Sequence, residues 1–174
     1  MKWLLLALLL PATALAIDHD YVRVTRNAAT CPQANMPGCG DRVIVALHDL
    51  QMSFGDNRLN LSRGSIMVVE NEEAIQPPVG EYFEVVIKRG HPPVLSPPEI
   101  IPPEKNAMLY EGKYFFVFAE KLEPGDTRPR HSHSQRVVIQ LNRTRLQQWP
   151  DGEPEKIVEI PVESPSFSPP VIHV

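Results

Sequence analysis

The chain has 174 residues and a formal net charge of −4, a length that suits one ordinary domain or two small ones. This charge gives no sign of the clustered basic surface that nucleic-acid binding requires, so we expect no nucleic-acid partner. The 19 prolines interrupt nearly every window of the sequence, so long helices are hard to place.

The first 16 residues, MKWLLLALLLPATALA, have the pattern of a secretory signal peptide. Lys2 supplies a short positive region, residues 3–10 are apolar, and residues 14–16 form an A-x-A cleavage pattern. The alternative is an uncleaved membrane anchor, but the apolar run is only about half of the roughly 20 residues that span a bilayer. We therefore expect a secreted or periplasmic protein that starts at Ile17 and has no membrane association after cleavage. His19, close to this start, is expected to be exposed.

Two cysteines, Cys31 and Cys39, enclose a short Pro/Gly loop. In an oxidising compartment a disulfide between them is the expected state, and two free thiols are the alternative.

The remaining apolar runs predict β-strands. They are rich in β-branched and aromatic residues and are separated by Pro and Gly, which is typical of an antiparallel sandwich or barrel. The expected strands, in chain order, lie at 42–52, 64–70, 81–88, 114–124, 135–142 and 156–162.

The sequence also contains an internal repeat. RVIVALHDLQM (42–52) matches RVVIQLNRTRL (136–146) at an offset of 94, and DYVRV (20–24) falls on YFFVF (114–118) at the same offset. PPVGEYFEVVIK, which starts at Pro77, parallels the terminal PPVIHV. Ordered matches of this kind indicate a duplication.

The repeat predicts the domain organisation. Residues 1–16 are the signal peptide, 17–90 the first half, 91–105 a Pro-rich linker and 106–174 the second half. The first half continues beyond its PPV segment as far as Lys88, whereas the second ends at Val174. We therefore expect the second half to be incomplete at its C-terminus, and the alternative is that a partner chain supplies the missing strand.

The stretch GDTRPRHSH places Gly125 five residues before His131-Ser132-His133, and PPVIHV adds His173. This spacing resembles the metal motifs of the cupin superfamily. The resemblance implies a double-stranded β-helix, the cupin jelly-roll barrel, in two copies as in bicupins. It also implies that His131, His133 and His173 bind a divalent transition metal, which could be Zn, Fe, Mn, Cu or Ni. Cupins of this sort include dioxygenases and isomerases, act on small molecules, and often pair into homodimers.

The motif departs from the family pattern at the fourth ligand. The usual Glu would fall at Val137 or Val138, and Gln135 is the nearest substitute, a weaker neutral ligand. In the first half the repeat offers Pro37 and Cys39 in place of the histidine pair, so no metal is expected there. His48 corresponds to Asn142, which argues against a ligand role for His48.

The chemistry of the histidines supports the same hypothesis. Residues i and i+2 of a strand share one face, and neutral imidazoles suit these metals. Two other interpretations stay open, because the stretch also carries a cationic set: Arg128, Arg130 and Arg136. Either the set and Gln135 bind an anionic or small ligand without metal, or the stretch is a solvated turn in a structural, non-catalytic cupin. No catalytic residue can be named.

Overall fold

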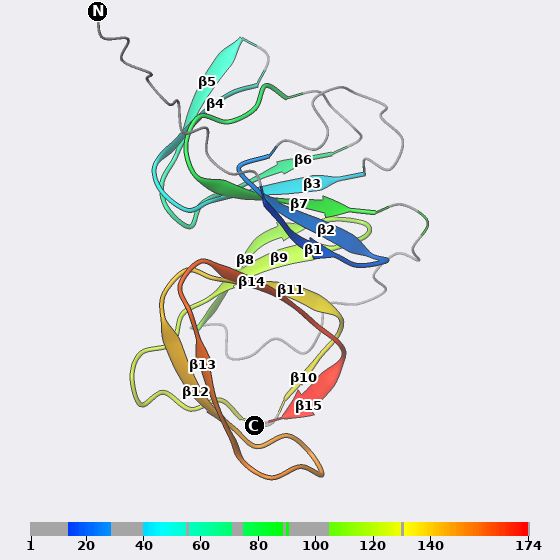
Figure 1. Ribbon diagram of the computed structural model, residues 1–174, viewed down its shortest axis with the longest axis vertical. Helices are drawn as coiled ribbons and strands as arrows, with labels where there is room; N and C mark the ends of the chain where they lie inside the picture. Colours follow the sequence, from blue (N-terminus) through cyan, green and yellow to red (C-terminus); the bar gives the residue numbers. More distant parts are fainter. Residues whose placement is uncertain are drawn as a thin grey trace, which may run out of the picture.

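The computed structural model describes residues 14–28, 40–54, 56–70, 75–88, 90, 105–129 and 131–173. Within them the chain is all β and antiparallel, as the sequence predicts (Figure 1). No described segment forms a helix that is long and apolar enough to cross a bilayer. Cys31, Cys39 and Arg130 lie outside the described residues. The strands are β1 (Ala14–Asp18), β2 (Val22–Arg26), β3 (Arg42–Ala46), β4 (Leu50–Phe54), β5 (Asn57–Leu61), β6 (Ile66–Val69), β7 (Tyr82–Ile87), β8 (Asn106–Glu111), β9 (Phe116–Glu120), β10 (His131–His133), β11 (Arg136–Gln140), β12 (Thr144–Gln148), β13 (Lys156–Ile160), β14 (Ser164–Ser168) and β15 (Val171–His173).

The first half is built on a five-stranded sheet with the order β1-β2-β7-β3-β6. Its inner strands, β3 (RVIVA) and β7 (YFEVVI), are buried along almost their whole length. A strand that is covered on both faces reads as a continuous apolar run rather than an alternating one. The sheet is therefore the core of the molecule, with packing partners on both sides.

The outermost strand, β1, begins at Ala14, ahead of the predicted cleavage point. Ala14 and Leu15 pair with Arg26 and Thr25, and after a register shift Ile17 pairs with Val24. Cleavage after residue 16 would leave only the last two residues of this strand. Ile17 would then still pack against the core cluster described below.

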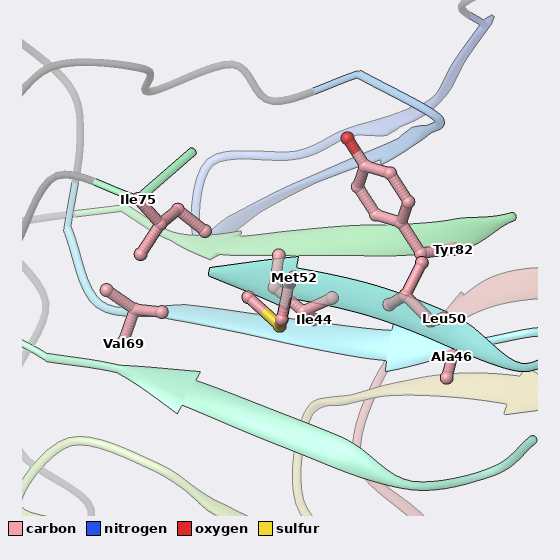
Figure 2. Close-up of a cluster of buried hydrophobic side chains, with 7 residues drawn as sticks. All are labelled: Ile44, Ala46, Leu50, Met52, Val69, Ile75 and Tyr82. Atoms are coloured by element: carbon pink, nitrogen blue, oxygen red, sulfur yellow. The ribbon is translucent and has the colours of Figure 1, made fainter. Parts of the chain in front are cut away.

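One face of the sheet is covered by the hairpin of β4 and β5. Figure 2 shows Met52 of β4 next to Ile44 of β3, and Leu50 of β4 next to Tyr82 of β7. These side chains are excluded from water, so their burial is the main stabilisation on this side. The cluster consists of Ile44, Ala46, Leu50, Met52, Val69, Ile75 and Tyr82.

The other face of the sheet packs against the second half of the chain. Phe83 and its apolar neighbours on β2, β3 and β7 form a second buried cluster. Side chains of the second half complete it: Phe115, Val117, Val137, Ile139 and Leu141. In Figure 1, β8, β9, β11 and β14 lie directly beneath the sheet. One apolar interface thus joins the two halves.

Each half contains a long antiparallel ribbon with a single register. In the first half, Arg42 pairs with Val69, and the same register leads without a shift to Phe54 opposite Asn57. In the second half, the register that pairs His131 with His173 continues through β11–β14 to Gln148 opposite Lys156. Gly152, at the tip of this ribbon, has a φ of +75°, a conformation that favours glycine.

The strands repeat as the sequence does. Residues 22, 42 and 50 begin β2, β3 and β4, and the residues 94 positions later begin β9, β11 and β12. The pairings correspond too, because β3–β6 and β4–β5 match β11–β14 and β12–β13. The remaining pairings give two-stranded ribbons, and they do not by themselves define a closed barrel.

One predicted strand is wrong in extent. The stretch 42–52 forms two strands rather than one, because the chain turns at residues 47–49. The turn is held by the Leu47 amide, which donates to the Glu81 carbonyl, and by the Gly64 amide, which donates to the Ala46 carbonyl. These partners are distant in sequence, so periodicity does not reveal the turn.

Candidate functional site

His131 and His133 form β10, at the open end of the second ribbon. The backbone of β10 pairs with that of β15, so His131 is opposite His173 and His133 is opposite Val171. The ladder therefore brings residue 173 to the histidine pair, although forty residues of sequence separate His133 from His173. The side chains of residues 171–173 are outside the described part of the structure.

The two histidine side chains meet. Their Nε2 atoms are 2.8 Å apart, and the rings stand edge to face with an interplanar angle of 87°. Both residues are buried, with exposed fractions of 6% and 8%. A polar pair at this depth has to satisfy its nitrogens within the protein or with a bound ligand.

A backbone carbonyl fixes the orientation of the His131 ring. Nδ1 of His131 lies 2.7 Å from the carbonyl oxygen of Pro129. Since a carbonyl only accepts, Nδ1 carries the hydrogen, and Nε2 of the neutral ring keeps its lone pair. In metal-bound histidines, a hydrogen bond from the ring nitrogen that does not bind the metal orients the ring and raises the basicity of the other nitrogen.

Electrostatics favours the neutral form of His131. Burial lowers its pKa most, the Pro129 carbonyl opposes this, and the cation of Arg128 lowers the pKa further. Arg136 also lowers the pKa of His131, by a smaller amount, and the charge of Glu120 raises this pKa. The neutral imidazole is the form that binds metals.

Three charged groups, Arg128, Glu120 and Arg136, act electrostatically on His131, and the first two form an ion pair with each other. Arg128 donates to both carboxylate oxygens of Glu120, at 2.8 and 3.0 Å. The Nη1 atom of Arg136 is buried and meets no hydrogen-bond acceptor among the described residues. Sequence reasoning did not single out Glu120, the last residue of β9, which precedes Arg128 by eight residues in the sequence.

Two residues lie at or near the expected fourth-ligand position, Gln135 and Val137, and their surroundings differ from each other. Gln135 is exposed at a bend after β10. Val137 packs against the apolar cluster between the halves. The role of Gln135 as a ligand therefore stays a prediction.

A second group of ligand-type side chains lies elsewhere, on three loops. His48, Glu81 and Glu163 have donor atoms within 4.8 Å of one another. The His48 Nε2 is 3.4 Å from a Glu163 oxygen and 3.9 Å from a Glu81 oxygen. Sequence reasoning argued against His48 as a ligand and missed the two glutamates, because only the tertiary structure joins these loops.

An arginine already occupies the second group. Arg26 donates to Glu81 at 2.7 Å and to Glu163 at 2.6 Å, and these contacts raise the pKa of Arg26. The guanidinium supplies the positive charge that a metal would bring. His48 and Glu81 are also largely exposed, so the group reads as an ionic contact between the halves, and the buried histidine pair is the better candidate site.

Comparison with known proteins gave no match to a family model, a curated protein or a solved structure.

Proposed function

We propose that the chain is an exported, metal-binding protein of the cupin type, with its site in the second half. His131, His133 and His173 would hold one divalent transition metal. The observation that carries this proposal is the buried histidine pair, whose Nε2 atoms meet at 2.8 Å while a carbonyl holds Nδ1 of His131. The pairing of β10 with β15 supports the third ligand, since residues directly opposite each other in an antiparallel ladder share a face.

The proposal extends to the fold. A long ribbon of constant register is the unit from which a double-stranded β-helix can be wound, and each half contains one. The repeated strands support two copies of this unit. Closure of each ribbon into a jelly-roll barrel is part of the proposal.

The chemistry follows from the ligand set. Three neutral imidazoles leave coordination positions open, so a bound metal would supply Lewis acidity or a site for substrate. We therefore propose a small-molecule metalloenzyme of the dioxygenase or isomerase class.

Ligand binding without metal is the second candidate function. The short contact between the two rings favours it, because one Nε2–H can donate to the other Nε2 and satisfy both nitrogens. A metal and this hydrogen bond exclude each other, so metal content separates the two functions.

Elemental analysis of the full chain tests the proposal. Purified protein is loaded separately with Zn, Fe, Mn, Cu and Ni, and the metal retained per chain is measured. We expect one equivalent of at least one metal in the wild type, and its loss in His131→Asn, His133→Asn and His173→Asn. His48→Asn is the matched control and should retain the metal.

Circular dichroism melting shows which variants are folded. Metal retained by all three folded site variants, or lost in His48→Asn, would contradict the assignment. A wild type that retains none of the five metals would favour ligand binding without metal.

A further inference from the structure

We infer that the histidine site takes a small oxyanion, a carboxylate or a phosphate, which the guanidinium of Arg136 binds beside the histidine pair. This inference rests on the proposed function, because it names the class of ligand at the same site. It depends on the charges around the pair and on the hydrogen bonding of Arg136.

The charge balance leaves a surplus of positive charge. Among the described residues, the charged groups that act on His131 are Glu120, Arg128 and Arg136. Arg128 and Glu120 form an ion pair with two hydrogen bonds, so the charge of Arg136 remains. A divalent metal held by three neutral imidazoles would add two further positive charges.

At the fourth-ligand position of the motif, the sequence provides no carboxylate to compensate this surplus. The position at which the related motif has a Glu is occupied by Val137 or Val138. Val137 packs in the apolar interface between the halves. A small shift of the chain therefore does not bring a carboxylate to the fourth-ligand position. The missing negative charge is then best supplied by the ligand itself.

Arg136 has the hydrogen-bonding capacity for such a ligand. Its Nη1 is buried and lacks an acceptor among the described residues, which is costly for a charged donor. Burial and repulsion by Arg128 lower the pKa of Arg136 to about 10. The side chain therefore stays protonated at neutral pH, and its planar fork matches carboxylate and phosphate oxygens.

The burial of the histidines limits the size of the ligand. His131 and His133 are almost fully covered, and the Arg128 side chain is only 12% exposed. A polymer or an extended surface would not reach such groups. Among possible ligands, a small free anion is the class that such buried groups favour.

Calorimetric titration with acetate and, separately, with inorganic phosphate tests the inference on the metal-loaded full chain. The wild type should bind at least one of the two anions, and comparison of the two titrations identifies the preferred chemistry. Arg136→Gln should weaken binding by about 10- to 100-fold, as expected for loss of a charge-assisted hydrogen bond. Arg136→Lys keeps the charge but loses the planar guanidinium, so its anion affinity should fall between those of the wild type and Arg136→Gln.

Arg143→Gln is the matched control, since Arg143 is an exposed arginine on the same ribbon, and this variant should bind like the wild type. Equal affinity in Arg136→Gln and wild type, or no binding of either anion, would overturn the inference. Metal content, measured on the same samples, keeps the two hypotheses apart. If the protein retains metal but binds neither anion, only the anion inference is contradicted. If it binds an anion through Arg136 but retains no metal, only the metal site is contradicted.

Discussion

Two opposite charges lie at the centre of the five-stranded sheet. Arg42 on β3 and Glu84 on β7 are 3.7 Å apart, with exposed side-chain fractions of 1% and 0%. A buried pair of this kind adds little net stability, but removal of one partner leaves a buried charge without its counter-ion. The pair therefore makes the core sensitive to single substitutions at these two positions.

We expect Glu84→Gln to lower the free energy of unfolding by about 3–5 kcal/mol, measured by urea denaturation. Arg42→Met should have a similar cost. The double variant Arg42→Met/Glu84→Leu removes both charges, and it should recover most of the stability. Additive losses in the double variant would show that the two side chains do not act as a pair.

Tyr82 gives the first half a dependence on high pH. Burial raises its pKa to about 12, with a further contribution from the charge of Glu84. Because the folded pKa exceeds the unfolded value, the stabilisation is complete below pH 10 and is lost as the pH rises towards 12. We expect this loss to be on the order of 2 kcal/mol.

Urea midpoints at pH 8 and pH 11 measure this effect. Tyr82→Phe cannot ionise, so it should lose less stability between the two pH values than the wild type. Tyr114→Phe, at an exposed tyrosine, serves as the control and should behave like the wild type. An equal loss in Tyr82→Phe and wild type would exclude Tyr82 as the cause.

At the level of the ribbons, two glycines allow the cost of backbone strain to be measured apart from the cost of a steric contact. Gly64 and Gly152 both have positive φ values, +83° and +75°. A Cβ at Gly64 would lie 3.1 Å from Leu141 of the second half, whereas one at Gly152 would meet nothing within 4 Å. The two positions thus differ chiefly in the contact between the halves.

Alanine substitutions exploit this difference. Gly152→Ala should cost about 1 kcal/mol from backbone strain alone. Gly64→Ala should cost about 1 kcal/mol more, because Leu141 has to move as well. Thermal unfolding of both variants measures the two values, and equal losses would show that Leu141 yields without cost.

The sequence predicts these elements unevenly, for physical reasons. β-branched runs such as residues 136–140 locate the strands, because strand propensity and burial act locally. The turn at residues 47–49 depends on partners distant in sequence, so it is missed. The histidine pair is predicted from local spacing, whereas the ion pair of Arg128 with Glu120, eight residues earlier, belongs to no motif that would mark it in the sequence.

The whole molecule depends on the contact between its halves. Phe83 and Val137, from different halves, belong to one buried cluster. Polar contacts add to it at the rim. Arg26 bonds to Glu163, and the Tyr110 hydroxyl bonds to the Glu70 carboxylate.

The same interface involves strand β1 and the residue that follows it. His19, expected from its position to be exposed, is partly buried and stacks on Phe167 of the second half, with ring centroids 3.8 Å apart. That expectation is wrong because β1 runs alongside β14. A face as apolar as that of the sheet cannot be left in water without loss of stability, so we expect the halves to unfold together.

A substitution far from the interface tests this coupling. In a chain expressed from Ile17 onward, which lacks Trp3, Trp149 is the single tryptophan, and it reports on the second half. Ile44 belongs to the cluster on the opposite face of the sheet, and Ile44→Ala should cost about 2–5 kcal/mol. If the halves form one cooperative unit, the Trp149 fluorescence transition in urea shifts to lower concentration by the full amount and coincides with the circular dichroism transition. A Trp149 transition that stays at the wild-type midpoint while circular dichroism shows an earlier loss of structure would mean that each half is stable alone, since the apolar face would then tolerate exposure.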